Sequence, residues 1–353
     1  MSSPQNKNSD ALPVMLVGGF GHAVCVFDEW QRDNAPVCLV GAVQTLPEET
    51  LDGFLSHPWA KKFTPSLYQD LQQALSVEKP DIVVVSTRPD QNPDVIERCL
   101  RAGCHVIAEK PLAVDEQGLI RLHQAVLETG KFILPMLGIE ASAFVEARAL
   151  VNQGVIGEPV LINTRKSYQW GKRADWFARR EAYGGIWAWV GIHAFNNAAF
   201  ITGRRTIDVL AAQERNRFHP DYPDCSDCLS GLFLLEGDIQ MTASIDLLRP
   251  DGQKEWGDDW CRIVGSEGSI EANPALGTIR LIHKGRDEEV RKVTAVAPPF
   301  YTAFLDAVKM NADFSALTTL GFQLTDSALT AGRASVEGLC NLEVNPDRWQ
   351  IVR

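Results

Sequence analysis

Short apolar runs alternate with helical patterns in the first part of the chain. The runs fall at residues 14–17, 37–43, 81–86, 105–108 and 132–135. Continuous apolar runs rich in β-branched residues are typical of strands that are buried on both faces of a parallel sheet. Strands of this kind, separated by helices, predict a doubly wound α/β domain of the Rossmann type over residues 13–135.

The pattern changes after residue 135. Longer segments at residues 159–168, 229–235, 238–246, 259–265 and 278–283 alternate between apolar and polar positions. Such alternation is typical of antiparallel strands with one buried face. We therefore expect an α+β domain over residues 136–353 with a large, mostly antiparallel sheet, and a final helix at 325–340 that packs back toward the first domain. The polar residues 1–12 are expected to form a disordered tail.

Composition narrows the range of functions. A formal net charge of −11 over 353 residues argues against binding to nucleic acid or to an anionic membrane, since both need a concentrated basic surface. Most of the eight cysteines lie in apolar runs, which indicates buried thiols in a reducing compartment, and no apolar run is long enough to span a bilayer. We therefore expect a cytoplasmic protein. Cys225 and Cys228 lack a second ligand pair, so we predict no metal site.

A glycine-rich turn follows the first predicted strand. Residues 18–24 read Gly-Gly-Phe-Gly-His-Ala-Val, and such a turn at the start of a helix lets backbone amides approach a pyrophosphate. Gly19 and Gly21 take the first two positions of the dinucleotide fingerprint, and Val24 takes the third. We expect a dinucleotide cofactor to contact both glycines and the adjoining Phe20 and His22. The alternative is a tight turn with a purely structural role.

The choice between NAD and NADP is left open by the second strand. Gln44 stands where a carboxylate would hold the ribose hydroxyls of NAD, and no arginine follows at once to hold the 2′-phosphate of NADP. After the next long strand, Thr87 and Asn92 are candidate cofactor contacts, although Thr87 can equally cap a structural turn. The sequence thus predicts NAD or NADP as cofactor.

A lysine lies just beyond the strand at residues 105–108. Open parallel sheets bind ligands beyond the carboxyl ends of their strands, so Lys110, followed by the rigid Pro111, is placed to face a bound cofactor. A lysine whose pKa is lowered by burial can exchange the proton of a substrate hydroxyl. Glu109 is expected to support the backbone or the cofactor from the side. The alternative is a solvated surface lysine.

A second glycine-rich turn precedes a histidine in the second domain. Gly184 and Gly185 lead into an apolar helix that carries Trp189 and, four residues later, His193. Positions four apart share a helix face, so a carboxylate at the first position would act together with the histidine. A tryptophan cannot orient an imidazole through a charge, whereas Asn196, one turn beyond His193, could fix its tautomer. The alternative is a histidine buried in the core without a catalytic role.

These motifs, in this order, resemble the Gfo/Idh/MocA family of oxidoreductases. The Glu-Lys-Pro segment at residues 109–111 is the most specific of them, and family-like segments extend the likeness over roughly residues 12–340. The resemblance implies that Lys110 hydrogen-bonds the reacting oxygen and that His193 is its proton-transfer partner. The chain departs from the family at Trp189, where relatives carry an aspartate, and at Asn92, where they carry a histidine. It departs again at residues 137–140, where they carry an asparagine and an arginine.

Candidate substrate contacts lie in the second domain. Lys166 and Tyr168 alternate onto one face of a strand, and Trp176 follows in a loop. Cationic and hydroxyl donors against an aromatic wall suit a sugar or polyol, and Trp189 and Asn196 would complete the site. The alternative is an amphipathic strand whose Lys166 is solvated.

Three functions agree with these observations. The leading hypothesis is an NAD(P)-dependent oxidoreductase that transfers a hydride between nicotinamide and a sugar, polyol or related hydroxy compound. A non-catalytic regulatory protein of the same fold, binding a dinucleotide or sugar, is favoured instead by Trp189, Gln44 and Val24. The third is a transient redox step within a hydrolysis or an epimerisation. By analogy, the open face of the second sheet predicts a homodimer or homotetramer.

Overall fold

The computed structural model describes residues 11–138, 141–253 and 255–351. Most of the tail expected at residues 1–12 lies outside the described residues, and so do Ile139 and Glu140 of the segment that departs from the family. At the start of the described chain, Leu12 already belongs to the first strand.

The first lobe is built on a parallel sheet of six strands in the order β3-β2-β1-β4-β5-β6. The strands are β1 (Leu12–Val17), β2 (Val37–Val43), β3 (Ser66–Tyr68), β4 (Ile82–Val85), β5 (His105–Ala108) and β6 (Ile133–Pro135). The predicted Rossmann fold is confirmed. The sequence did not predict β3, because its three residues are largely exposed and carry no apolar run.

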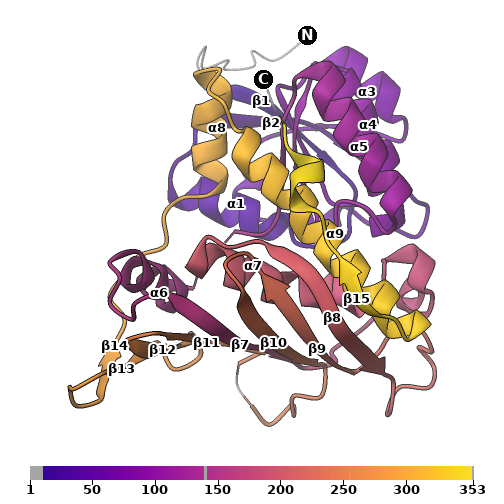
Figure 1. Ribbon diagram of the computed structural model, residues 1–353. Helices are drawn as coiled ribbons and strands as arrows, with labels where there is room; N and C mark the ends of the chain where they lie inside the picture. The colour runs from indigo at the N-terminus through magenta and orange to yellow at the C-terminus, as the bar shows by residue number, and fades with distance from the viewer. Residues whose placement is uncertain (1–10, 139–140, 254, 352–353) are drawn as a thin grey trace.

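Helices cover both faces of this sheet (Figure 1). They are α1 (Ala23–Arg32), α2 (Asp52–Leu55), α3 (Leu71–Glu78), α4 (Asn92–Arg101) and α5 (Glu116–Thr129). Apolar side chains of α3, α4 and α5 form one core with the sheet, and those of α1 and α2 form another on its opposite face. The carboxyl ends of the strands therefore meet at one edge that turns toward the rest of the molecule, which is where parallel sheets bind ligands.

The second lobe is built on a sheet of nine strands in the order β14-β13-β12-β11-β7-β10-β9-β8-β15. The strands are β7 (Pro159–Tyr168), β8 (Thr206–Arg215), β9 (Cys228–Leu235), β10 (Ile239–Asp246), β11 (Gly257–Gly265), β12 (Gly268–Asn273), β13 (Thr278–His283), β14 (Glu289–Lys292) and β15 (Cys340–Glu343). Only the central pair β10 and β7 is parallel among the pairings of the described strands. The predicted large, mostly antiparallel sheet is confirmed.

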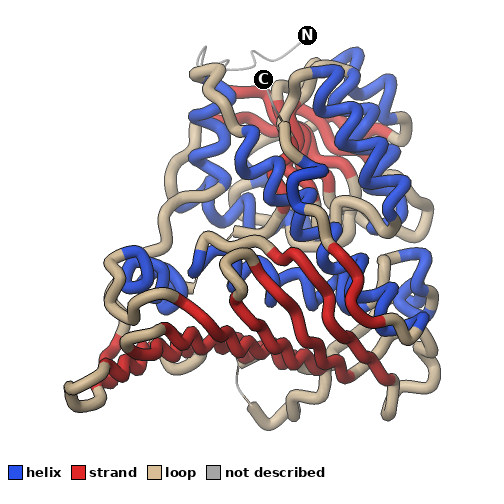
Figure 2. Tube along the Cα trace, viewed as in Figure 1, coloured by secondary structure: helices blue, strands red, loops and turns tan. Residues whose placement is uncertain are grey.

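Helices lie on one face of this second sheet, the face turned toward the first lobe (Figure 2). They are α6 (Ser142–Asn152), α7 (Ile192–Thr202) and α9 (Ser315–Glu337), while α8 (Tyr301–Lys309) packs on α1. Helix α9 begins ten residues before the expected 325 and contacts strands of both sheets, β6 in the first and β8 in the second. Within the described residues, no helix combines the length and apolar character needed to cross a bilayer.

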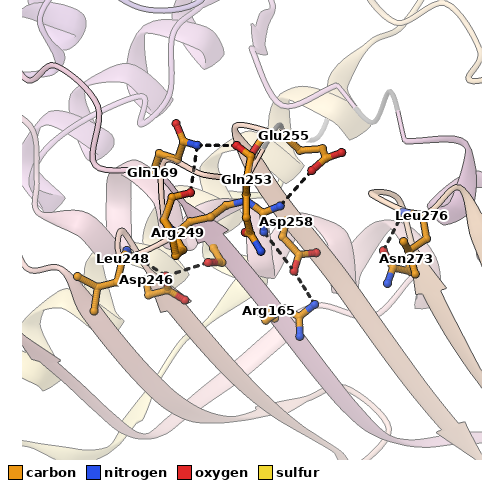
Figure 3. A network of polar contacts seen from close by, with 12 residues as sticks. Arg165, Gln169, Asp246, Leu248, Arg249, Gln253, Glu255, Asp258, Asn273 and Leu276 are labelled. Carbon is orange, nitrogen blue, oxygen red and sulfur yellow. Dashed lines mark hydrogen bonds and ion pairs between the residues drawn. The ribbon is translucent and has the colours of Figure 1, made fainter.

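A polar network at one end of the second sheet connects β7 with β11 (Figure 3). The Arg165 guanidinium donates to the Asp258 carboxylate at 2.7 Å, and Arg249 lies 3.6 Å from the same carboxylate. Arg249 also donates to the backbone carbonyl of Glu255. Because neighbouring residues on a strand point to opposite faces, the adjacent pair, Lys166 opposite Asp259, lies on the other face of the sheet.

Candidate active site

The turn that carries Lys110 is held by a buried asparagine. The Asn92 amide donates to the carbonyl oxygens of Glu109 (3.0 Å) and Pro111 (2.8 Å), and its own oxygen accepts from the Thr87 hydroxyl at 2.6 Å. Both Thr87 and Asn92 are fully buried. Their side chains, which the sequence predicts as cofactor contacts, thus form hydrogen bonds that support the Lys110 turn.

The Lys110 ammonium lies against Trp189. Its Nζ donates to the Trp189 carbonyl at 2.8 Å and lies 3.8 Å from the centre of the indole ring. Trp189 belongs to a π-helical turn, Trp187–Gly191, a local geometry that is common at functional sites. Burial lowers the pKa of Lys110 to about 8, although the Glu109 carboxylate, 3.9 Å away, opposes this shift. The tryptophan that replaces the family's aspartate therefore holds the lysine rather than the histidine.

Lys110 and His193 line one cavity between the lobes. Its volume is about 330 Å³, at the lower end of the range for small-molecule sites. The polar side chains around it belong to His22, Lys110, Lys166, Tyr168, His193, Asn197, Asp259 and Tyr301. Two residues 83 positions apart in the sequence thus meet beside the same space.

His193 is neutral at neutral pH. Burial holds its pKa well below the usual range, and the positive charges of Lys166 and Lys110 act in the same direction. A neutral imidazole can accept a proton or donate one, depending on its tautomer. It can therefore serve as the partner of a group that changes its protonation state.

The asparagine that faces this cavity is Asn197 and not Asn196. The Asn196 amide donates to the Leu137 carbonyl at 2.8 Å, so its predicted substrate contact is replaced by a structural one. Asn197 lines the cavity, is 4% exposed, and its Nδ2 has no hydrogen-bond partner among the described residues. A buried amide without a partner is costly unless a ligand satisfies it. The sequence could have identified Asn197, because it follows His193 by four residues and therefore shares its helix face.

The face of β7 that lines this cavity carries an ion pair. The Lys166 Nζ lies 2.7 Å from both carboxylate oxygens of Asp259 on β11, and the ammonium lies 5.0 Å from the Tyr168 ring centre. Lys166 is 3% exposed, which is inconsistent with the solvated alternative. The sequence did not single out Asp259, because only the pairing of β7 with β11 places it opposite Lys166.

Aromatic side chains connect the glycine-rich loop with the second lobe. The ring of Phe20 lies edge-on to Trp176 with centres 5.8 Å apart, and Trp176 lies edge-on to Trp189 at 5.9 Å. The His22 ring is also 5.9 Å from that of Trp189. These contacts bring Trp176, predicted as a substrate contact, against the loop predicted to hold the cofactor.

The glycine-rich loop has the backbone geometry of a tight strand-to-helix turn. Gly18 and Gly21 have φ values of 92° and 83°, which other residues adopt only with strain. Ala23 is fully buried in the contact between α1 and the sheet, whereas Val24 is 37% exposed. Val24, at the third fingerprint position, therefore points largely to solvent, and the close contact between α1 and the sheet is made by Ala23, one residue earlier.

The amides of this loop are hydrogen-bonded within the protein. The Gly19 amide donates to the Glu49 carboxylate, and the His22 amide (2.6 Å) and its Nδ1 (2.9 Å) pair with the Glu109 carboxylate. The Phe20 amide donates to the Ser86 carbonyl at 2.8 Å. A pyrophosphate needs such amides and is repelled by carboxylates that hold them. As arranged here, the loop does not fit the phosphates of a dinucleotide.

The Gln44 side chain also forms hydrogen bonds within the protein. Its side-chain amide donates to the carbonyls of Leu46 (2.9 Å) and Glu49 (3.0 Å). The residue that stands in the ribose-binding position therefore holds the segment that carries Glu49.

Comparisons with known proteins cover both lobes. The family model described as "Oxidoreductase family, NAD-binding Rossmann fold" matches residues 15–135, and the model "GFO/IDH/MocA C-terminal domain" matches residues 144–271. The chain is 29% identical over 134 residues to inositol 2-dehydrogenase of Rhizobium meliloti, covering 37% of this chain and 39% of that one. It is 24% identical over 234 residues to the NAD(+)-linked scyllo-inositol 2-dehydrogenase of Bacillus subtilis, covering 64% of each. The matches thus span less than two thirds of these relatives.

Solved structures share the whole architecture. A candidate oxidoreductase from Thermotoga maritima superimposes with a TM-score of 0.86 at 27% identity, over 94% of this chain and all of that one. Levoglucosan dehydrogenase in complex with NADH gives 0.79 at 15% identity, over 97% of this chain and 100% of that one, a likeness that shows the fold alone. Both family models, the inositol dehydrogenase relatives and the shared fold lead to one conclusion: the chain belongs to the Gfo/Idh/MocA family of oxidoreductases, and residues 15–135 form the Rossmann domain of that family.

Proposed function

We propose that this protein is an oxidoreductase acting on the CH–OH group of a sugar, polyol or related hydroxy compound bound in the cavity between the lobes. The cofactor that we assign is a nicotinamide dinucleotide, NAD or NADP. The observation that carries the proposal is the convergence of Lys110 and His193 on that cavity. The inositol dehydrogenases among its relatives support a polyhydroxylated substrate.

Lys110 is the group that we assign to the substrate hydroxyl. With a pKa of about 8, its amine exchanges protons near neutral pH, as a general acid or base requires. His193 is neutral and lines the same cavity, so it can take the proton onward. The unpartnered amide of Asn197 is available to a second hydroxyl or a carbonyl oxygen of the substrate.

Substitution of the lysine tests this assignment. Lys110→Ala should lower kcat/KM by about 10²–10⁴-fold, the usual contribution of a positioned acid–base group. Rates would be followed by the absorbance of reduced nicotinamide across a panel of sugars and polyols, with the exposed Lys172→Ala as a control. Turnover unchanged in Lys110→Ala would remove Lys110 from the mechanism.

A second candidate is a non-catalytic protein that binds a small polyol for regulation. It is favoured by the carboxylates of Glu49 and Glu109 on the loop amides, which leave the loop unfit for phosphates as arranged. Calorimetry that detects a bound polyol, combined with no turnover on the whole panel with either cofactor, would support this function instead.

We also propose that the protein forms a homodimer or homotetramer through the outer face of the second sheet. In the described residues that face carries no helix, and its central part is a shallow hollow of about 490 Å³ that includes Trp260, Leu232 and Arg165. None of the eight cysteines, all of which lie in the described part of the chain, forms a disulfide, which suits a reducing compartment such as the cytoplasm.

A further inference from the structure

The buried carboxylate of Glu49 contacts the glycine-rich loop, although Glu49 is not part of the Rossmann fingerprint. Glu49 is 4% exposed and accepts hydrogen bonds from the Gly19 amide, from the Thr45 amide (2.7 Å) and hydroxyl (2.9 Å), and from the Leu46 amide (3.1 Å). No lysine or arginine among the described residues forms an ion pair with it. Its charge is therefore held by backbone and hydroxyl donors, as a bound anion would be.

The segment that carries Glu49 is fastened over the loop. We use the term strap for residues 45–50, which follow β2. The Gln44 side chain donates to the strap carbonyls of Leu46 and Glu49, and a Cβ at Gly19 would collide with the strap carbonyl of Thr50. The strap thus lies in van der Waals contact with the residue whose amide a pyrophosphate would use.

We propose that the strap is a built-in competitor of the dinucleotide, and that the cofactor binds only when Glu49 leaves the Gly19 amide. The proposal rests on the assignment of a dinucleotide cofactor made above. The carboxylate and a pyrophosphate need the same amide, and two anions at one site repel each other. Gln44 and Glu49 would then set the affinity for the cofactor, in place of the acidic residue that usually contacts the ribose.

A binding measurement distinguishes this role from a purely structural one. The affinities for NADH and NADPH would be measured by calorimetry or by quenching of tryptophan fluorescence, without substrate. Glu49→Gln keeps the shape of the side chain but removes the charge. It should tighten binding by about tenfold to a hundredfold, the range expected from loss of a charge-assisted hydrogen bond that competes with the ligand.

The neighbouring Glu48 provides a matched control. Its side chain is 56% exposed and lies 3.5 Å from Arg88, away from the loop amides, so Glu48→Gln should leave the affinity unchanged. Gln44→Ala, which releases the strap without altering Glu49, should tighten binding in the same direction. This second variant keeps the test decisive if Glu49→Gln folds poorly.

The wild-type protein gives an independent readout. Hydrogen exchange at the Thr45 and Leu46 amides should accelerate when NADH saturates the protein, because both lose the Glu49 carboxylate. Binding that is equal in wild type, Glu49→Gln and Gln44→Ala, with unchanged exchange, would overturn the strap proposal and leave the cofactor assignment standing. No binding to any of the three would overturn both.

Discussion

Lys110 is held by a carbonyl oxygen and an indole ring, with its nearest carboxylate 3.9 Å away. The sequence predicted Lys110 and His193 as site residues because a lysine after a parallel strand and a histidine after a glycine-rich turn are local patterns that resemble the motifs of the Gfo/Idh/MocA family. It could not predict that Trp189 would hold the lysine, since that contact joins residues from different lobes.

The pKa of Lys110 sets the expected pH dependence. The neutral amine accepts the proton of an alcohol, so kcat/KM for oxidation should rise with pH and level off above about 8, whereas reduction should show the opposite trend. Initial rates measured between pH 6 and 10 would test this, because that range extends about two units to each side of the pKa. In Lys110→Arg the inflection should vanish, because arginine stays protonated. An inflection retained in that variant would assign it to another group.

Asn197 and Asn196 are adjacent residues with different expected roles. Asn197→Ala should raise KM by up to about tenfold and change the free energy of unfolding less than Asn196→Ala does, because its Nδ2 has no hydrogen-bond partner among the described residues to lose. Asn196→Ala should instead lower the free energy of unfolding by about 1–3 kcal/mol, since it leaves the buried Leu137 carbonyl unsatisfied. Steady-state kinetics and urea unfolding measure the two effects, and a reversed result would exchange the assignments.

Among the elements, strands with a regular run or alternation of apolar residues were easier to predict than short or irregular ones. The predicted ranges 37–43, 105–108, 159–168 and 278–283 coincide with β2, β5, β7 and β13. Strand β8 was missed because two shifts in its pairing with β9 break the alternation of buried and exposed positions. Strand β15 was missed because it is short and mostly exposed, and pairs with β8 only through tertiary structure.

The crossing of α9 over the first sheet depends on a glycine. A Cβ at Gly321 would lie 2.9 Å from Pro135 Cγ, so Gly321→Ala should lower the free energy of unfolding by about 1–3 kcal/mol through overpacking. Gly53→Ala in α2, where the added methyl group meets open space, is the control and should be neutral or slightly stabilising. Thermal and urea unfolding would measure both. Equal stability of the two variants would show that α9 can shift to make room.

At the scale of the whole molecule, the outer face of the second sheet is the proposed subunit contact. Leu232→Glu introduces a charge in the middle of that face and should convert the oligomer to monomers in sedimentation analysis. Leu67→Glu, at an exposed position on β3 of the first lobe, should leave the oligomer intact. A wild-type protein that sediments as a monomer would refute the proposed assembly.

Helix α9 has 23 residues and is therefore about 35 Å long, and it lies against β6 and α5 at one end and against β8 and β15 toward the other. A helix that packs on both lobes limits how far they can move apart, because a wide hinge motion would bend the helix or break its contacts with one lobe. Admission of a cofactor should then require a small local rearrangement at the mouth of the crevice, with the two halves of the molecule keeping their relative orientation.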